Sequence, residues 1–476
     1  MKRFLARLLK LGAFGGSCAV TLAGMELFFN VLHDGAFPHL NVYSEDAGLG
    51  VRLQPNASQR LAFAGNPATD IHINSWGYRG EEWPEVAEGG QPEVLVVGDS
   101  QVFGLGVEAH ETFSARLQER LGRPVLNAGV PTYGPGEYAA DAAPLIDHRN
   151  VDTVVIVINL YNDLFEASRP NTLRHTVWDG WAVRSETMPD DFWQFPGRRT
   201  LMRSSHLIFA ARRAWYGLTA PDLDLATPSE GGWSDVVVLA EESQQTTERL
   251  GSERRQQRSL LERTLADTER ELERLAMGYT DSPLRISDRD DQMAWEASRK
   301  SVGDIVYDRY AEASRPVEVT AAMVRRGAEL RARTLAVARE MSGHEGEVAA
   351  QLTEAEAGLE ALEGPILVSP VAQHLHALAA DCRAYGADLV VVALPMDVQV
   401  SAEEWAKYDL ESQDMTATLA LNADVLAAAE DAGASGLDAL PALREAEPGA
   451  FLRGDLHMTA KGHQALADAL YAHLTQ

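Results

Sequence analysis

Hydrophobic residues alternate between strand-like runs and helix-like spacings in the first part of the chain. Three short, continuous apolar runs, at residues 93–97, 124–127 and 151–158, are typical of strands buried on both faces of a sheet. Helices are predicted between these runs, at about 111–121 and 138–147, and the first repeats apolar residues at four-residue intervals. This order predicts an α/β fold with a parallel sheet and right-handed crossovers.

The same rhythm returns near the C-terminus. A fourth strand is predicted at residues 388–394, and helices are predicted at about 371–385, 422–432 and 460–474. Residues 35–90, ahead of the first strand, are rich in Gly, Pro and Asn and are expected to form a loop-rich lead-in. We therefore expect two separated parts of the chain to build one α/β domain.

A long segment with a different pattern separates these two parts. Residues 236–277 and about 319–362 are charged and amphipathic, and a shorter helical piece at about 288–310 lies between them. We expect an antiparallel helical hairpin inserted into the α/β domain. The leucine spacing is heptad-like for only about two heptads per helix, which is short for a coiled coil. A spacer or packing arm is therefore slightly favoured over an arm for self-association or for a protein partner.

The chain length agrees with this division. With 476 residues, the chain is too long for one ordinary domain and long enough for a large domain with an insertion. The predicted segments are an N-terminal membrane helix at 1–33, the first part of the α/β domain at 34–165, a helical, coiled-coil-like insertion at 166–364, and the second part of the α/β domain at 365–476.

The N-terminal segment has the pattern of a membrane anchor. Apolar residues predominate from Leu11 to about Leu32, which just reaches the roughly 20 residues that a transmembrane helix needs. Four cations precede this run: Lys2, Arg3, Arg7 and Lys10. This asymmetry predicts a cytoplasmic N-terminus, an uncleaved inner-membrane helix and a periplasmic or extracytoplasmic remainder. A signal peptide cleaved near Thr21-Leu22-Ala23 is the alternative, and lipidation at Cys18 is a weaker one.

Composition excludes several classes of ligand. The chain has 42 Lys and Arg against 70 Asp and Glu, a formal net charge of -28, so we expect no nucleic-acid partner. Two cysteines, Cys18 and Cys382, provide no disulfide framework, and the 13 histidines are scattered. Gly104-Leu105-Gly106 lacks the further glycine and lysine of a phosphate-binding loop. The sequence predicts no metal and no cofactor.

A candidate nucleophile follows the first predicted strand. Ser100, in Gly98-Asp99-Ser100, lies at the carboxyl end of that strand, where ligands bind in open α/β sheets. A serine needs a base, and His457 precedes the last helix with Asp455 two residues before it. The alternative is structural: the turn residues Asp99 and Ser100 cap a helix, and His457 is a surface residue.

Two further strands end in groups that could stabilise an oxyanion. Gly129 follows the second strand, where its backbone N–H can approach a substrate closely, and Asn162 follows the third with a side-chain amide that donates directly. The N–H of Ser100 is a third candidate donor. Each residue alone is more often part of a turn, but all occur in one chain order at the ends of sheet elements.

Together these features resemble the SGNH/GDSL hydrolase superfamily. Gly98-Asp99-Ser100, Gly129, Asn162 and the Asp455/His457 pair are similar to its blocks I, II, III and V. The flanking pieces that resemble its membrane-anchored bacterial branch are Asn74-Ser75-Trp76-Gly77-Tyr78-Arg79-Gly80, Asn127-Ala128-Gly129-Val130-Pro131-Thr132-Tyr133-Gly134, and Leu394-Pro395 with Gln399-Val400. The resemblance covers roughly residues 35–165 and 366–474.

The resemblance implies a flavodoxin-like three-layer α/β/α sandwich and ester chemistry. It implies Ser100 as nucleophile, His457 as base and Asp455 as the residue that orients it, with oxyanion donors at Ser100, Gly129 and Asn162. The sequence departs from the usual block V, because Gly454 stands where Asp normally lies three residues before His. The shorter Asp-x-His spacing is similar to that of the alginate O-acetyltransferase-like group.

These expectations lead to an extracytoplasmic serine esterase or O-acyl transferase. Its substrates would be ester-modified polysaccharides of the cell envelope or exported polysaccharides, with acetyl as the most sensible acyl group. Hydrolysis and transfer share one acyl-enzyme and differ only in the acceptor, so the choice between them stays open. The alternative is a catalytically silent envelope scaffold that binds glycan and uses the helical arm for a partner. A lipase is disfavoured by the acidic composition.

Overall fold

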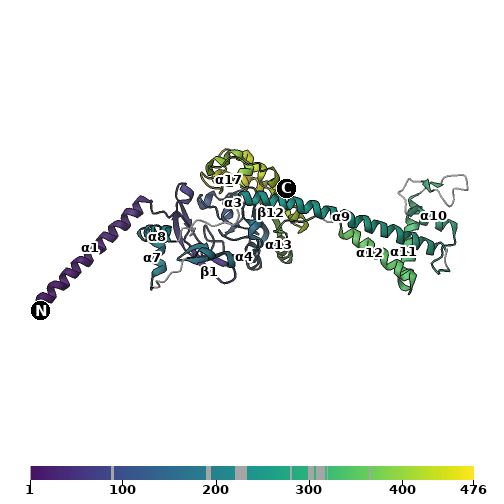
Figure 1. Ribbon diagram of the computed structural model, residues 1–476, viewed down its shortest axis with the longest axis horizontal. Coiled ribbons are helices and arrows are strands. Elements are labelled where there is room, and N and C mark those ends of the chain that lie inside the picture. Colours follow the sequence, from purple (N-terminus) through teal and green to yellow (C-terminus); the bar gives the residue numbers. More distant parts are fainter. Residues whose placement is uncertain are drawn as a thin grey trace. The chain divides into compact units, whose positions relative to one another are not determined.

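The structure is a computed structural model in which two compact units can be described. The described residues are 2–86, 90–188, 195–219, 233–278, 281–298, 305–306, 317–318, 320–363 and 366–476. One unit comprises Met1–Thr246 and Leu367–Gln476, and the other comprises Thr247–Ile366 (Figure 1). The described part of residues 166–246 therefore belongs to the first unit. The domain boundaries expected from the sequence stay a prediction.

A five-stranded parallel sheet forms the centre of the first unit. The strands are β5 (Glu93–Gly98), β6 (Val125–Gly129), β7 (Val151–Asn159), β12 (Asp388–Leu394) and β13 (Ser435–Asp438). Their spatial order is β13-β12-β7-β5-β6, which is the 2-1-3-4-5 order of flavodoxin-like sheets read from the other edge. The expected fold class is thus confirmed, and the order reverses beside β5, the strand that leads to Ser100.

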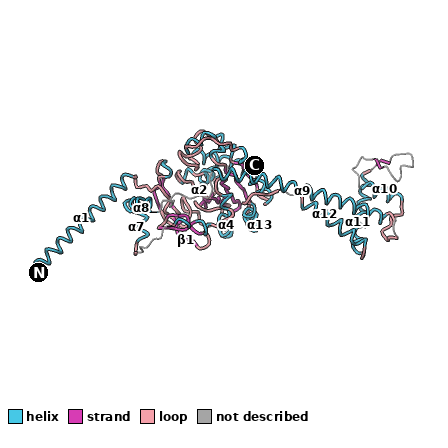
Figure 2. Tube along the Cα trace, viewed as in Figure 1, coloured by secondary structure: helices cyan, strands magenta, loops and turns pink. Residues whose placement is uncertain are grey.

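Helices cover both faces of this sheet and give it three layers (Figure 2). The helices packed on one face are α4 (Pro135–His148), α13 (Ala372–Tyr385) and α15 (Leu419–Asp431). Those on the other face are α3 (Phe113–Leu121), α16 (Leu440–Ala446) and α17 (Ala460–Leu474). Side chains alternate between the two cores along each strand: Leu95 and Val97 point to the first core, whereas Val94 and Val96 point to the second.

The N-terminal lead-in is more regular than its composition predicts. It forms two antiparallel hairpins, β1 (Tyr43–Asp46) with β2 (Gly50–Leu53) and β3 (Ser58–Leu61) with β4 (Thr69–His72). A third hairpin and four short helices follow β7: β8 (His175–Trp178) with β9 (Trp181–Arg184), α5 (Asp163–Glu166), α6 (Asn171–Arg174), α7 (Arg198–Ser204) and α8 (His206–Thr219). Four-residue strands are too short to show a hydrophobic period, so the sequence could not predict them.

The second unit is mainly helical. Its helices are α9 (Trp233–Ala276, which starts in the first unit), α10 (Arg289–Ser298), α11 (Ala321–Glu340) and α12 (His344–Ala361), and β10 (Ile305–Val306) pairs with β11 (Val317–Glu318). The predicted single helix at 319–362 is wrong, because the chain turns at Gly343, whose φ of +98° is unfavourable for other residues. Part of the predicted helical piece at 288–310, residues 299–304 and 307–310, lies outside the described residues.

The N-terminal helix α1 (Lys2–Leu32) meets the length and composition of a membrane span. Among the described residues, Lys10–Leu32 is the one stretch that meets these criteria, and none of its apolar window is buried inside the protein. Phe14 and Val20 are among its exposed side chains. The helix is thus suited to a membrane anchor or a signal sequence.

Candidate active site

The turn after β5 presents Ser100 at the start of the short helix α2 (Ser100–Phe103). The Asp99 carboxylate accepts a hydrogen bond of 2.8 Å from the N–H of Gln101 and so caps this helix. The helix lies close over the strand ends: a Cβ atom on Gly129 would stand 2.3 Å from the backbone nitrogen of Phe103. Glycine at 129 is therefore needed to let α2 approach the sheet, whatever further role its N–H has.

Ser100, His457 and Asp455 come together at this edge of the sheet. The Nε2 atom of His457 lies 2.7 Å from the Oγ atom of Ser100. On the other side of the ring, Nδ1 is hydrogen-bonded to the Asp455 carboxylate, which also accepts the backbone N–H of His457 at 2.9 Å. The relative exposure of both Ser100 and His457 is 7%. The three groups have the connectivity of a nucleophile, a base and an orienting acid.

Charge interactions within this group oppose the effects of burial. Burial disfavours protonation of His457, but the charge and hydrogen bonds of Asp455 outweigh it and raise the pKa of the imidazole. Burial also opposes ionisation of Asp455, whose pKa is nevertheless lowered by His457 and by the nearby ammonium of Lys407. The arrangement therefore favours an ionised carboxylate beside an imidazole that can accept a proton.

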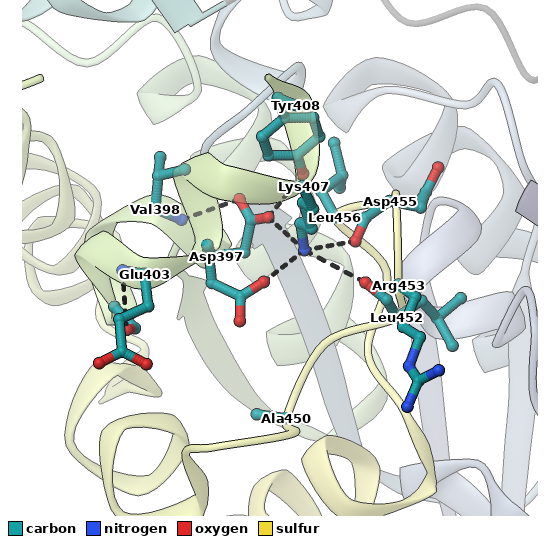
Figure 3. A network of polar contacts seen from close by, with 12 residues as sticks. Asp397, Val398, Glu403, Lys407, Tyr408, Ala450, Leu452, Arg453, Asp455 and Leu456 are labelled. Atoms are coloured by element: carbon teal, nitrogen blue, oxygen red, sulfur yellow. Dashed lines mark hydrogen bonds and ion pairs between the residues drawn. The ribbon is translucent and has the colours of Figure 1, made fainter. Parts of the chain in front are cut away.

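Lys407 joins Asp397, at the start of the short helix α14 (Asp397–Val400) that follows β12, to the loop that carries Asp455 (Figure 3). It lies in the 3-10 turn Ala402–Tyr408, and its Nζ atom donates to the carbonyl oxygens of Asp455 at 2.6 Å and Leu452 at 3.3 Å. The same ammonium pairs at 2.6 Å with the carboxylates of Asp397 and Glu404. Asp397 is fully buried, so Lys407 supplies its counter-charge while holding the loop in place.

Gln101 holds the same loop from the side of the nucleophile. Its Nε2 atom donates to the carbonyl oxygen of Leu456 at 3.2 Å, and its Oε1 atom accepts the N–H of Met458 at 3.4 Å. These two residues flank His457 in the chain, so one side chain fixes the backbone on both sides of the base. The ring of Phe63 meets the imidazole edge to face, with centroids 5.2 Å apart.

Gly129 ends β6 and Asn162 follows β7, the strands on either side of β5, but their polar groups already have partners. The N–H of Gly129 donates to the Oδ1 atom of Asn127 at 3.0 Å. The Nδ2 atom of Asn162 donates to Glu166 at 3.0 Å, and the Asp99 carboxylate is a second hydrogen-bond partner of this side chain. Among the described residues, the N–H of Ser100 has no acceptor. Of the three predicted oxyanion donors, Ser100 is thus the one whose N–H the structure leaves unengaged.

A buried polar network supports the strand ends beneath these residues. The Asp99 carboxylate accepts the Nδ2 of Asn159 at 2.8 Å, and Asp163 accepts the N–H of Asn159 at 2.8 Å and the hydroxyl of Tyr138 at 2.7 Å. Burial, strengthened by the proximity of Asp99, raises the pKa of Asp163 well above its usual value. The network accounts for the polar residues after β7 without requiring them to touch substrate.

Arg79, from the motif Asn74-Ser75-Trp76-Gly77-Tyr78-Arg79-Gly80, supports the other end of α2. Its buried guanidinium donates to the carbonyl oxygens of Phe103 at 3.1 Å, Gly104, and Val107 at 2.5 Å. Burial lowers its pKa to about 10. Because one planar fork serves three backbone acceptors, Arg79 fixes the loop that follows the nucleophile helix.

A second buried histidine of the described chain, His463, is not hydrogen-bonded to this group. His463, in α17, is buried against Phe113 and accepts that residue's N–H at 3.2 Å, and burial lowers its pKa to about 3. It is therefore a neutral packing residue. Within the described ranges, no group of three or more His, Cys, Asp or Glu side chains has an arrangement that could hold a metal ion.

The contacts that hold the site were only partly predictable from sequence. Ser100, His457 and Asp455 follow from strand ends and motif spacing, whereas Gln101 and Lys407 were not predicted. Gln101 is adjacent to the predicted nucleophile, which is the one signal that could have drawn attention to it. Lys407 lies 13 residues after the end of β12, in the 3-10 turn Ala402–Tyr408, and no pattern in the sequence indicates what its side chain reaches.

Comparison with known families supports the resemblance in the C-terminal part. Residues 359–476 match a family model described as an SGNH hydrolase-like domain of the acetyltransferase AlgX. This segment contains β12, β13, Lys407, Asp455 and His457, and the resemblance to SGNH hydrolases is confirmed there. No curated protein matches the chain. The matched segment suggests acetyltransferase or esterase activity.

Proposed function

We propose that this protein is a serine-dependent O-acetyl transferase or esterase that acts outside the inner membrane on ester-modified polysaccharide. The observation that carries the proposal is the 2.7 Å contact between His457 Nε2 and Ser100 Oγ, with Asp455 bound to the opposite ring nitrogen. The match of residues 359–476 to an SGNH hydrolase-like acetyltransferase domain supports the same chemistry.

The first half of the reaction forms an acyl-enzyme. The Ser100 oxygen attacks the carbonyl carbon of the ester while His457 Nε2 removes its proton, and Asp455 stabilises the resulting imidazolium. The tetrahedral intermediate then collapses: the bond to the leaving alkoxide breaks, and the imidazolium returns the proton to that oxygen. The products are acetyl-Ser100, the free alcohol and a neutral His457.

The intermediate carries a negative oxygen that needs preorganised donors. The N–H of Ser100 points to this role because it is unengaged, whereas the Asn162 amide is already bound to Glu166 and Asp99. The N–H of Gly129 takes part only when the substrate oxygen replaces or shares the contact with Asn127. We therefore assign the oxyanion to Ser100 first, and to Asn162 and Gly129 in a substrate-bound state, when the substrate oxygen replaces or shares their present contacts.

The second half of the reaction decides between transfer and hydrolysis. His457 removes a proton from an incoming hydroxyl, whose oxygen attacks the acetyl carbon and releases Ser100 with its proton restored. If the hydroxyl belongs to a sugar, an O-acetyl group is transferred; if it belongs to water, acetate is released. The description of the matched family as an acetyltransferase favours a sugar acceptor.

The proposed location follows from the N-terminal helix. An uncleaved α1, with its four cations on the cytoplasmic side, would hold the catalytic unit against the outer face of the inner membrane. Polysaccharides of the envelope, or those in transit through it, are the acceptors available there. The second unit is proposed to mediate self-association or to bind a protein partner.

The test is turnover of 4-nitrophenyl acetate by the full chain in a neutral detergent. The Ser100→Ala and His457→Ala variants should each lose at least about 10³-fold in kcat/KM while keeping a native circular dichroism spectrum. Matched controls are Ser259→Ala and His376→Ala, which change exposed residues outside the site and should retain activity. Equal turnover by the parent and Ser100→Ala would remove the basis for the proposed function.

A further inference from the structure

A cavity lined by basic and neutral polar side chains lies at the end of the N-terminal helix. It has a volume of about 570 Å³ and contains none of Ser100, His457 and Asp455. The described residues that line it include no Asp or Glu, although the chain has 70 such residues. Its cationic lining comes from Arg60, Arg199 and Arg203. The side chains that line the cavity are thus cationic or neutral, although the chain as a whole is acidic.

Two of these arginines have no carboxylate partner among the described residues. Arg199 donates to the carbonyl oxygen of Tyr43 at 2.8 Å, and Arg203 donates to the side-chain oxygen of Gln54. Both acceptors are neutral. Arg60, by contrast, is paired with Asp34 and Asp70 and is already neutralised.

The electrostatics of α7 agree with an uncompensated charge. Arg199 and Arg203 lie four residues apart in α7, so their side chains are neighbours on one helix face. Burial and the positive charge of Arg199 both lower the pKa of Arg203. The adjacent Arg198 has a different environment, because it pairs with Asp179 at 2.8 Å. An anion between Arg199 and Arg203 would relieve their repulsion.

The cavity is placed at the level of the membrane surface if α1 spans the bilayer. The candidate span ends at Leu32, and Asn30 and Gly35 both line the cavity. A helix of 23 residues is about 34 Å long, close to the roughly 30 Å of a bilayer's hydrocarbon core. Its outer end therefore lies at the depth of the lipid phosphates.

Contacts between α1 and α8 fix this end of the helix against the folded unit. The Glu26 carboxylate accepts the N–H groups of His206 at 2.8 Å and Leu207 at 3.0 Å, at the start of α8. These bonds cap α8 with a side chain of the membrane helix. The short segment between α7 and α8 is thereby held against the last turns of α1.

We propose that this cavity binds the phosphate group of an anionic phospholipid headgroup, held between Arg199 and Arg203. Guanidinium groups match phosphate oxygens in charge and in bidentate geometry. The inference rests on the anchored location proposed above and is independent of the ester chemistry. A free phosphate ester has the same recognition chemistry, but the cavity's position beside the membrane helix favours the lipid as its source.

The test measures lipid binding to the full chain in dodecyl maltoside by native mass spectrometry. Dioleoyl phosphatidylglycerol and dioleoyl phosphatidylcholine are compared for the parent, for Arg199→Gln/Arg203→Gln and for the exposed single change Arg199→Glu. The parent should prefer phosphatidylglycerol, and both variants should bind it at least about tenfold more weakly, since each variant loses at least one charge-assisted contact to the phosphate. The variant Arg249→Gln/Arg258→Gln, which removes two exposed charges of α9, is the matched control.

The outcomes separate the pocket from other sources of binding. The cations before α1 also attract anionic lipid, but they are intact in every variant, so only the difference between variants reports the cavity. Undiminished phosphatidylglycerol binding by well-folded Arg199→Glu and Arg199→Gln/Arg203→Gln would overturn the proposal. If millimolar glycerol phosphate displaced bound phosphatidylglycerol as effectively as added phosphatidylglycerol does, a lipid would be overturned as the source of the bound phosphate. Ester turnover measured in the same samples shows whether the proposed function fails separately.

Discussion

The Nε2 atom of His457 lies 2.7 Å from the hydroxyl oxygen of Ser100, although 357 positions separate the two residues in the chain. The contact forms because the carboxyl end of β5 and the loop that carries His457 lie at the same edge of one parallel sheet. Gln101 and Lys407 then hold the loop from two sides, through backbone atoms on either side of the base.

The pH dependence of ester turnover should report the His457–Asp455 pair. Because the base must be neutral, kcat/KM should fall as the pH drops through the imidazole pKa, which Asp455 raises above its usual value near 6.5. Asp455→Asn removes this charge, so the acidic limb should move to lower pH while the rate falls by about 10⁴-fold. The measurement is kcat/KM for 4-nitrophenyl acetate from pH 5 to 9. An unmoved limb in Asp455→Asn would contradict the assigned pairing.

The same pair predicts the sign of a stability change. A raised His457 pKa means that the folded state binds the proton more tightly, so this contribution is present at low pH and is lost as the pH rises through the folded pKa. The lowered pKa of Asp455 contributes stability above the unfolded carboxyl pKa, which is lost as the pH falls. Both contributions are fully present between the unfolded carboxyl pKa and the unfolded imidazole pKa. His457→Gln should therefore reduce the melting temperature most within that pH window.

Lys407 should act as a positioning residue for the base. Lys407→Met removes the donor to the carbonyls of Leu452 and Asp455, and a loop displacement of about 1 Å can reduce turnover by about 10²-fold. The ammonium also lowers the pKa of His457, so its loss should move the acidic limb of kcat/KM to higher pH. The readouts are the rate and the pH profile.

The double variant Lys407→Met/Asp397→Asn separates positioning from folding. It removes the buried charge of Asp397 that the single variant leaves unpaired, so it should recover stability without recovering the rate. Lys461→Met, which changes an exposed lysine in α17, is the matched control. If the double variant regained full activity, Lys407 would be a structural counter-ion only.

A buried ion pair between the start of β5 and the end of α4 should be important for stability. The Arg149 guanidinium contacts both oxygens of Glu93, at 2.6 and 2.8 Å, and lies over the rings of Trp76 and Trp83. Arg149→Met should lower the free energy of unfolding by about 3–5 kcal/mol, because Glu93 is left buried and unpaired. Urea unfolding followed by tryptophan fluorescence measures this change.

A more exposed ion pair provides the control for Arg149→Met. Arg123 pairs with Asp152 at 2.7 Å, with side-chain exposures of 23% and 42%. Arg123→Met should therefore change the free energy of unfolding by no more than about 1 kcal/mol. Similar losses in the two variants would show that burial does not determine the strength of the Arg149 pair.

The sequence predicts the strands whose apolar runs are long and misses those defined by tertiary contacts. Runs such as Glu93–Gly98 and Val151–Asn159 identify sheet strands, whereas β13 has the sequence Ser-Gly-Leu-Asp and lacks any apolar run. The break at Gly343 also escapes the periodicity of the flanking helices. The spacing of apolar residues shows which side of a regular helix or strand is buried. A short edge strand or a single turn has too few residues to produce a recognisable spacing.

Candidate site residues follow the same division. Ser100 and the Asp455/His457 pair could be predicted because they follow strands or precede a helix within a known spacing. The contacts of Lys407 depend on how an irregular turn folds back on a loop 45 to 48 residues away, which local sequence does not encode. The engaged N–H of Gly129 likewise depends on the rotamer of Asn127.

Mapping the reactive serine tests the central claim most directly. The full chain would be treated with a fluorophosphonate probe, digested and analysed by mass spectrometry, beside His457→Ala and the His376→Ala control. We predict labelling at Ser100 in the parent and in His376→Ala, and at least about 10²-fold slower labelling in His457→Ala. Absence of label at Ser100 in folded protein, or an equal rate in His457→Ala, would contradict the account.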